Sequence, residues 1–251
     1  MVDKPVVQYV VEELVRAGIR RVLFVTGRRK RAIEDHFDAA PELDAGPLID
    51  PRTGLQILYT RQATPAGLGD AIRYGEGLAS DGGVVVALGD TIIAPPARAG
   101  TGVVSRLIDQ YRARGASAAV AVERVPDEAV SRYGVVICGE DRRVDDVVEK
   151  PDPGEVTSRL AIAARYVLGP SVFAALRDTE PDPSGEVQLT DALRRVIEGG
   201  GLVVAVPLSD GERRHDIGTI EGYCAVFLEH ALAHPQLGPK LRSRAAALLD
   251  G

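Results

Sequence analysis

Short apolar runs alternate with amphipathic segments along the first half of the chain. The apolar runs are rich in β-branched residues and almost continuously hydrophobic, as strands buried on both faces are. They cover Val22–Thr26, Leu55–Thr60, Val84–Leu88 and Ala116–Val122. The segments with helical spacing of apolar residues are Pro5–Ala17, Arg29–Phe37, Gly67–Leu78 and Val103–Arg114. This β-α-β-α order predicts an α/β fold with a doubly wound, mostly parallel sheet.

The alternation of strands and helices ends after Val125, where strand-like runs follow one another with little helix between them. These runs are Tyr133–Cys138, Val144–Glu149 and Leu160–Val167, and they predict a half with antiparallel or mixed pairing. Helical patterns return at Ser171–Arg177, Leu189–Glu198, Thr219–Ala233 and Lys240–Leu249. Since no repeats or low-complexity linkers interrupt the chain, we expect residues 1–251 to form a single domain.

The first predicted helix is followed directly by the strand Val22–Thr26, which makes the second half of a βαβ unit. Right-handed crossovers run from a strand, through a helix, to a parallel strand. The strand expected before the helix is not found in the chain. The pattern alone therefore predicts either an N-terminal truncation or a fold in which the first helix is an addition.

Composition and charge narrow the class of protein. A hydrophobic share of 45% and a charged share of 26% are ordinary for a globular domain. The net charge of -6 and pI near 5.3 argue against a nucleic-acid partner. No apolar run reaches the roughly 18 residues that a membrane span needs, and no signal peptide opens the chain. With only Cys138 and Cys224, we expect a cytoplasmic protein without a disulfide framework.

Two aspartates at predicted strand and loop boundaries are candidate metal ligands. Leu88-Gly89-Asp90 ends an apolar strand at its carboxyl end, where open α/β sheets bind ligands. A carboxylate there can bind Mg²⁺, which usually takes one or two protein carboxylates beside substrate phosphates. Capping of the next turn explains Asp90 equally well, and Asp216, which precedes a predicted helix, can also be a cap.

The segment Glu149-Lys150-Pro151 follows another predicted strand. Lysine is rare in the chain, at four positions, so a lysine at this corner favours a compact charge for a phosphate. Pro151 disfavours helical backbone at Lys150, which predicts an extended conformation there. An exposed ion pair at a strand end is the alternative interpretation.

Three further segments are compatible with a nucleotide or sugar ligand. Gly67 and Gly69 open a helix and can let backbone amides approach a ligand, while Gln62 can both donate and accept, as reading a nucleobase requires. Gly134 lies early in a strand, as it would for close approach of a ligand, and Glu186 can bind sugar hydroxyls. An ordinary strand-to-helix turn explains the first of these segments equally well.

Taken together and in their order along the chain, these motifs resemble those of the bacterial UTP–glucose-1-phosphate uridylyltransferases, within the sugar nucleotidyltransferases. The similarity runs from Val2-Asp3-Lys4-Pro5 through His215-Asp216-Ile217-Gly218 and the helix that follows. Its most specific parts are Glu149-Lys150-Pro151 and Gly185-Glu186-Val187-Gln188-Leu189-Thr190-Asp191-Ala192. The resemblance implies a Rossmann-like sheet of the nucleotide-diphospho-sugar transferase type with a mixed-strand sugar-binding half.

The resemblance also implies a reaction and a role for each candidate. UTP and glucose 1-phosphate would give UDP-glucose and pyrophosphate, on a homo-oligomeric enzyme that needs Mg²⁺. Catalytic roles fall to Asp90 and Lys150, with Asp90 and Asp216 as metal ligands. The substrate-binding positions would be Gln62, Gly67, Gly89, Gly134, Glu149 and Glu186.

The chain departs from the family at specific points. Members open with a strand and a glycine-rich loop for the triphosphate, ahead of the segment that begins here at Val2, so the domain is expected to be N-terminally truncated relative to them. Ala63 and Ala164 stand where the family usually has glycine. Two alternatives to an active uridylyltransferase therefore stay open. One is an impaired paralogue that binds sugar phosphate or UDP-sugar, or partners an intact subunit, and the other is a related thymidylyltransferase.

Overall fold

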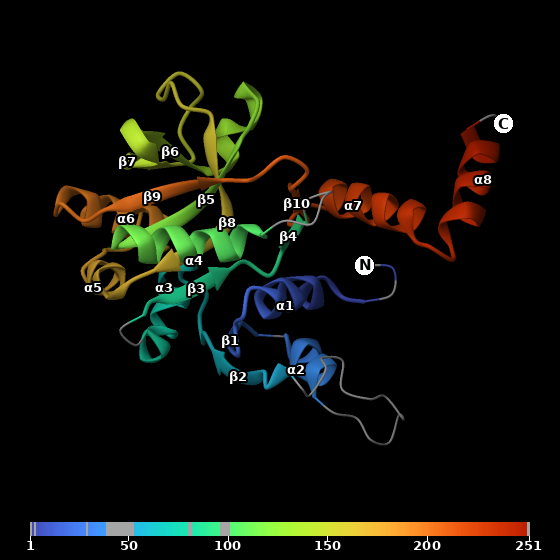
Figure 1. Cartoon of the computed structure of the whole chain (residues 1–251), viewed down its shortest axis with the longest axis horizontal. Coiled ribbons are helices and arrows are strands. Elements are labelled where there is room, and N and C mark those ends of the chain that lie inside the picture. Colours follow the sequence, from blue (N-terminus) through green and yellow to red (C-terminus); the bar gives the residue numbers. More distant parts are fainter. Residues whose placement is uncertain are drawn as a thin grey trace.

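The computed structural model describes residue 2 and residues 4–28, 30–38, 53–79, 82–95 and 101–249. Its helices are α1 (Val6–Arg16), α2 (Arg31–Phe37), α3 (Gly67–Arg73), α4 (Val103–Arg114), α5 (Pro170–Arg177), α6 (Leu189–Glu198), α7 (Ile220–Ala233) and α8 (Gly238–Leu249). Its strands are β1 (Arg21–Thr26), β2 (Gln56–Arg61), β3 (Val84–Ala87), β4 (Thr91–Ala94), β5 (Ala118–Arg124), β6 (Gly134–Cys138), β7 (Val144–Glu149), β8 (Leu160–Leu168), β9 (Val203–Pro207) and β10 (Arg213–Asp216). Figure 1 shows their arrangement.

The central sheet has the order β7-β6-β8-β5-β9, and β3 also pairs with β8. Strands β3, β5, β6 and β9 run in one direction, because β3, β5 and β6 are all antiparallel to β8 while β9 is parallel to β5. Two smaller ladders accompany it, a parallel β1–β2 pair and an antiparallel β4–β10 pair. The predicted doubly wound α/β class, with a mixed second half, is confirmed.

Alternation along β5 shows how helices cover both faces of the sheet. Ala118, Val120 and Val122 join a cluster with the buried residues of α5 and α6. Ala119 and Ala121 face the other way and join a cluster with α1 and α4. Because successive strand residues point to opposite faces, an uninterrupted apolar strand requires two such layers.

The edge of β8 organises the region where the candidate residues lie. β3 pairs with the end of β8, from Arg165 to Leu168, and β6 pairs with its beginning, at Leu160 and Ala161. Between these two pairings β8 is irregular, and Ala164 has a left-handed backbone with φ of 57°. The carboxyl end of β3 and the amino end of β6 therefore meet on the same edge of β8.

Most predicted elements are present, and α4, α6 and β7 have the predicted bounds. Three strands were not predicted: β4, β9 and β10. The strand β10 contains His215 and Asp216. Asp216 is therefore the last residue of a strand, and α7 begins four residues later. Its four residues are mostly charged, and only pairing with β4 makes them a strand.

A cavity of about 780 Å³ separates β1 from β3. All of β1 and β3 line it, together with parts of α1 and α4. Within the part of the chain that the structure describes, β1 pairs only with β2 and β3 only with β8. The cavity therefore lies between two strand edges that have no strand partner among the described residues.

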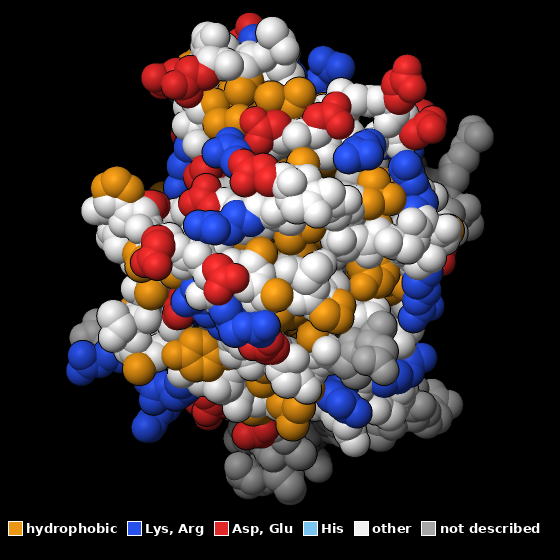
Figure 2. All heavy atoms as spheres, turned by 90° about the vertical axis from the view of Figure 1, so that its left-hand side faces the viewer, with side chains coloured by type: hydrophobic (Ala, Val, Ile, Leu, Met, Phe, Trp, Pro, Cys, Tyr) orange, Lys and Arg blue, Asp and Glu red, His pale blue; other side chains and the backbone are white. Residues whose placement is uncertain are grey.

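The C-terminal helices α7 and α8 project from the body of the molecule (Figure 1). On the face seen in Figure 2, acidic and basic side chains are interspersed. No helix among the described residues is both long enough and apolar enough to cross a membrane.

Candidate functional site

Asp90 and Asp216, far apart in the sequence, lie side by side in the structure. The β4–β10 ladder pairs Thr91 with Asp216, and the Ile217 backbone N–H donates to the Asp90 carbonyl oxygen at 3.0 Å. A side chain at Gly218 would lie 3.2 Å from Asp216 Oδ1 and 3.8 Å from Asp90 Oδ2. Both carboxylates therefore border the same small space, which Gly218 leaves open.

Asp216 is held by neighbours that the sequence did not reveal. The Tyr133 hydroxyl donates to Asp216 Oδ2 at 3.3 Å, and the Arg132 guanidinium lies 3.8 Å from the same oxygen. The Arg214 guanidinium stacks over the Tyr133 ring at 3.9 Å and pairs with Glu123. The sequence gives only a weak signal for this contact, since Tyr133 is simply the first residue of a predicted strand.

This donor set fits a divalent cation bound together with phosphates. The described residues contain no cluster of three or more His, Cys, Asp or Glu side chains that could hold a metal by themselves. Two carboxylates are what Mg²⁺ typically takes from a protein when substrate phosphates and water complete its shell. The Tyr133 hydroxyl is an outer partner of the kind that orients a carboxylate ligand. Asp90 and Asp216 are thus suitable ligands for Mg²⁺.

Glu149 lies at the end of β7, opposite Gly134 on β6. The Thr190 hydroxyl at the start of α6 donates to Glu149 Oε2 at 3.1 Å. A Cβ atom at Gly134 would lie 2.9 Å from the Thr190 methyl and 3.3 Å from Glu149 Oε2. Gly134 is therefore required by the packing of these two side chains, and a ligand is not needed to explain it.

Lys150 departs from the predicted extended backbone. Its φ is 43°, in the left-handed region, and its backbone N–H donates to the Tyr133 carbonyl at 3.1 Å. The prediction was wrong because proline restricts the preceding residue mainly against right-handed helical backbone, and the chain must turn sharply as β7 ends. The Lys150 ammonium lies 3.7 Å from Glu149 Oε1 and is more than half exposed.

Gln62 and Gly67 lie together at the end of β2. The Gln62 side-chain amide donates to Asp70 Oδ2 at 2.6 Å and to the Gly67 carbonyl oxygen at 3.4 Å. Because both partners can only accept, the NH₂ group must face them, and the Gln62 oxygen points elsewhere. Gln62 therefore keeps a free acceptor within this group of residues.

Gly67 and Gly69 pack against the segment that carries Glu186. The Gly69 N–H donates to the Val187 carbonyl at 2.8 Å, so this amide is not free for a ligand as the sequence suggested. A Cβ atom at either glycine would come within 3 Å of Val187 backbone atoms. The exposed Glu186 side chain lies beside Gly67, and its carboxylate accepts from Gln188 at 3.3 Å. The glycines thus let two chain segments approach closely.

The structure gathers the candidates into two neighbouring groups. Asp90, Asp216, Lys150 and Glu149 are linked through the backbone and side chain of Tyr133. Gln62, Gly67 and Glu186 form the second group, which α6 joins to the first through Thr190. Gly89 is exposed in the turn before Asp90, where a side chain would meet nothing within 4 Å.

Tyr166 lies beneath the first group. Burial raises the pKa of its hydroxyl, and the Glu149 and Asp90 carboxylates raise it further. The phenol, which is neutral at physiological pH in any case, is thus kept neutral to still higher pH.

Comparisons with known proteins agree with this architecture. The Nucleotidyl transferase family matches residues 1–231. A UTP–glucose-1-phosphate uridylyltransferase 2 of Streptococcus pyogenes is 37% identical over 97% of this chain and 85% of its own length. A UTP-bound UGPase from Acinetobacter baumannii is 29% identical and superimposes with a TM-score of 0.83 over 98% of this chain and 88% of that one. A UDP-glucose pyrophosphorylase complexed with UDP-glucose is 33% identical, with a TM-score of 0.77 over 91% of this chain and 88% of that one.

Proposed function

We propose, since the chain belongs to the nucleotidyl transferase family and has UTP–glucose-1-phosphate uridylyltransferases among its relatives, that it makes UDP-glucose. A phosphate oxygen of glucose 1-phosphate attacks the α-phosphorus of UTP. One P–O bond forms there as the bond to the leaving pyrophosphate breaks. The observation that carries this proposal is the pairing of Asp90 with Asp216 next to the Glu149-Lys150 corner.

Asp90 and Asp216 would hold Mg²⁺ together with the phosphates of the substrates. When bound, the ion neutralises charge on the phosphates as pyrophosphate leaves. Tyr133 keeps the Asp216 carboxylate oriented through its hydrogen bond, and the β4–β10 pairing keeps Asp90 beside it. Most of the catalysis assigned to these residues is positioning and charge neutralisation.

The remaining candidates divide between the sugar phosphate and the base. Lys150 is an exposed cation that can pair with the phosphate of glucose 1-phosphate, while Glu149 and Glu186 can accept from hexose hydroxyls near Gly134. Gln62 presents its oxygen as an acceptor, which matches the N–H on the pairing edge of uracil. Gly67 would border the base beside Gln62, and the exposed Gly89 would border the substrate beside Asp90. We propose the cytoplasm as the site of action, where UTP is available.

The test is a pyrophosphate-release assay with UTP, glucose 1-phosphate and Mg²⁺. Asp90→Asn and Asp216→Asn are each expected to lower kcat/KM at least about 100-fold, the cost of removing a central electrostatic group. Asp109→Asn, an exposed position on α4, is the matched control and should leave the rate unchanged. Wild-type activity that persists in both site variants would contradict the assignment.

This assay, together with calorimetry, also distinguishes a uridylyltransferase from a sugar-nucleotide binding protein and from a thymidylyltransferase. Calorimetric binding of UDP-glucose without pyrophosphate release would identify a binding protein instead of a transferase. Faster turnover with dTTP than with UTP would identify a thymidylyltransferase.

We further propose that the protein is a homo-oligomer, and the support comes from α7. This helix is apolar on several sides and leaves large side chains open, at Ile220, Tyr223, Phe227 and Leu228. Ile220 is 86% exposed and Leu228 is 54% exposed, which is unusual for an isolated molecule. Sedimentation should show assembly of the wild type and a shift to monomer in Leu228→Lys. Leu58→Lys, at an exposed apolar residue of β2, should not shift it.

A further inference from the structure

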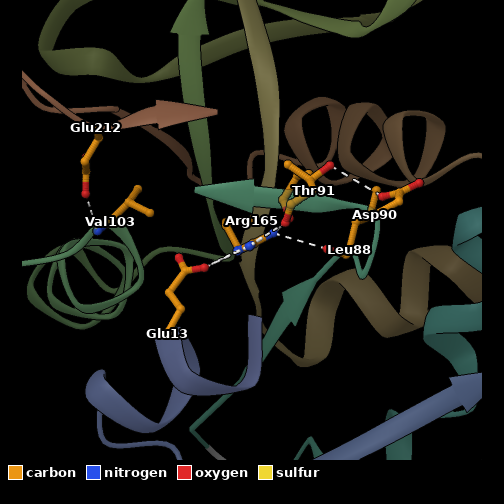
Figure 3. Close-up of polar contacts among 8 residues, drawn as sticks. Glu13, Leu88, Asp90, Thr91, Val103, Arg165 and Glu212 are labelled. Atoms are coloured by element: carbon orange, nitrogen blue, oxygen red, sulfur yellow. Dashed lines mark hydrogen bonds and ion pairs between the residues drawn. The ribbon is translucent and has the colours of Figure 1, made fainter. Parts of the chain in front are cut away.

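Arg165 on β8 is a charged side chain with no exposed surface, and it is the largest side chain that is fully buried in the described part of the protein. Its Nε and Nη2 donate to Glu13 Oε2 on α1 at 3.1 and 2.8 Å. Figure 3 shows the guanidinium between the α1 carboxylate and the turn that follows β3. An ion buried to this degree is retained only where hydrogen bonds and an opposite charge compensate for lost water.

The other donors of Arg165 reach both sides of Asp90. Nη2 donates to the Thr91 carbonyl at 2.9 Å, and Nη1 lies 3.4 Å from the Leu88 carbonyl. Thr91 directly follows Asp90, and Leu88 precedes it by two residues, so one planar group bridges the turn (Figure 3). The left-handed Ala164 directs its carbonyl to the same place, where it accepts from Arg165 Nη1 at 3.0 Å and from the Leu88 N–H at 3.2 Å.

Core stability alone is a poor explanation of this arrangement. Buried ion pairs contribute little net stability, and apolar groups of similar volume often replace them without loss. One Glu13 oxygen is also buried without a hydrogen-bond partner among the described residues, which adds a cost. What the guanidinium provides, and an apolar side chain cannot, is a rigid fork of donors that fixes two carbonyls.

We propose that the Arg165–Glu13 pair positions the Leu88–Thr91 turn so that the Asp90 carboxylate faces Asp216. Arg165 is thus a positioning residue, which acts on the metal site through the backbone. The inference rests on the proposed function, in which Asp90 and Asp216 hold the divalent cation. It also connects α1 directly to the metal site, because Glu13 anchors the guanidinium.

The test measures metal affinity instead of turnover. Mn²⁺ is titrated into the full chain with UDP-glucose present, and free Mn²⁺ is followed by electron paramagnetic resonance. Arg165→Met is expected to raise the Mn²⁺ dissociation constant about tenfold, as loss of an outer partner of a metal site does. UDP-glucose affinity without metal should stay unchanged. Arg165→Lys should give a smaller shift, because an ammonium keeps the positive charge and can still donate to a carbonyl. Glu13→Gln tests the pair from the α1 side if Arg165→Met fails to fold.

Arg73→Met is the matched control. Arg73 also donates to backbone carbonyls, those of Leu176 and Thr179 at the end of α5, away from Asp90. It should lower the melting temperature and leave the Mn²⁺ constant unchanged. An equal Mn²⁺ constant in wild type and the Arg165 or Glu13 variants would overturn the proposal. A wild type that binds UDP-glucose but no Mn²⁺ would instead refute the metal assignment, and the positioning role with it.

Discussion

Ala164 is a residue whose importance comes from its backbone conformation and not from its side chain. It has φ of 57° within β8, a region that L-residues other than Asn and Asp rarely adopt. The left-handed conformation turns its carbonyl to Leu88 and Arg165. The strain is therefore located next to the turn that carries Asp90, as strained residues often are at functional sites.

Ala164→Gly is expected to be nearly neutral, within about 0.5 kcal/mol in the free energy of unfolding. Relief of roughly 1–2 kcal/mol of left-handed strain offsets the loss of a buried methyl and the added freedom of the unfolded chain. Ala163→Gly, equally buried but with ordinary backbone, should cost about 1.5 kcal/mol because nothing offsets these two losses. Urea denaturation measures both, and equal losses would contradict strain at Ala164.

His215 gives a residue-scale prediction on pH. Burial lowers the pKa of this imidazole, although the nearby Glu229 carboxylate opposes the shift. A histidine with a lowered folded pKa is neutral in the native protein, and the unfolded chain takes up the proton first. Stability from this group is thus present above its unfolded pKa of about 6.5 and is lost as pH falls below it. Melting temperatures from pH 8 to 5 should fall less in His215→Gln than in the wild type.

At the scale of elements, the close approach of two chain segments organises the group formed by Gln62, Gly67 and Glu186. The start of α3 lies against Val187, with hydrogen bonds from Gly69 N–H to Val187 O and from Val187 N–H to Ala66 O, both at 2.8 Å. This pairing explains Gly67 and Gly69, which the sequence analysis interpreted as glycines that let backbone amides approach a ligand. It also sets the distance between Gln62 at the end of β2 and Glu186.

Gly69→Ala tests this packing. The new methyl would lie 2.7 Å from the Val187 carbonyl oxygen and 2.9 Å from Leu176, and neither a backbone nor a fully buried leucine can move cheaply. We expect a loss of about 1–3 kcal/mol in stability, the usual cost of overpacking, and weaker UDP-glucose binding. Gly77→Ala faces open space and should change stability by less than about 0.5 kcal/mol. Thermal unfolding and calorimetry distinguish the two variants.

At the scale of the whole molecule, the cavity between β1 and β3 is the main departure from a continuous sheet. Thr26 O accepts from Gln62 on the β2 side, and Leu88 N–H donates to β8. Because strand groups alternate in direction, the backbones of Leu23 and Val25, and of Val85 and Ala87, face the cavity. The cavity of about 780 Å³ between these two edges has room for a further strand.

Supplying such a strand should therefore stabilise the protein. An apolar five-residue segment, joined ahead of Val2 by a flexible glycine-serine linker, is expected to raise the melting temperature by at least about 2 °C, the shift for roughly 1 kcal/mol at this size. Amide hydrogen exchange in β1 and β3 should slow as the backbone groups become paired. The same extension with prolines at alternate positions cannot form the ladder and is the control. Equal effects of both extensions would contradict strand pairing.

Local pattern was sufficient for much of the protein. The buried strand β5 is apolar except for its last two residues, so it was found two residues from its predicted bounds. The amphipathic helices α4 and α6 carry their periodicity in adjacent residues, and their bounds were predicted correctly. Asp90 was recognisable because it follows the apolar strand β3, and Glu149 because it ends the predicted strand β7. The family also followed from short motifs in a fixed order.

Tertiary structure decided what depends on contacts between distant segments. Strand β10 is charged and exists only through its ladder with β4, which is also what brings Asp216 to Asp90. The Tyr133 hydrogen bond, the left-handed Lys150 and Ala164, and the Arg165–Glu13 pair likewise join residues or conformations that no local period encodes. The sequence by itself determined the fold class and most ligand candidates, because these depend on local spacing. Only the folded chain determined how Asp90 and Asp216, the proposed metal ligands, are held together, because their supports come from α1, β3, β4, β8 and β10 at once.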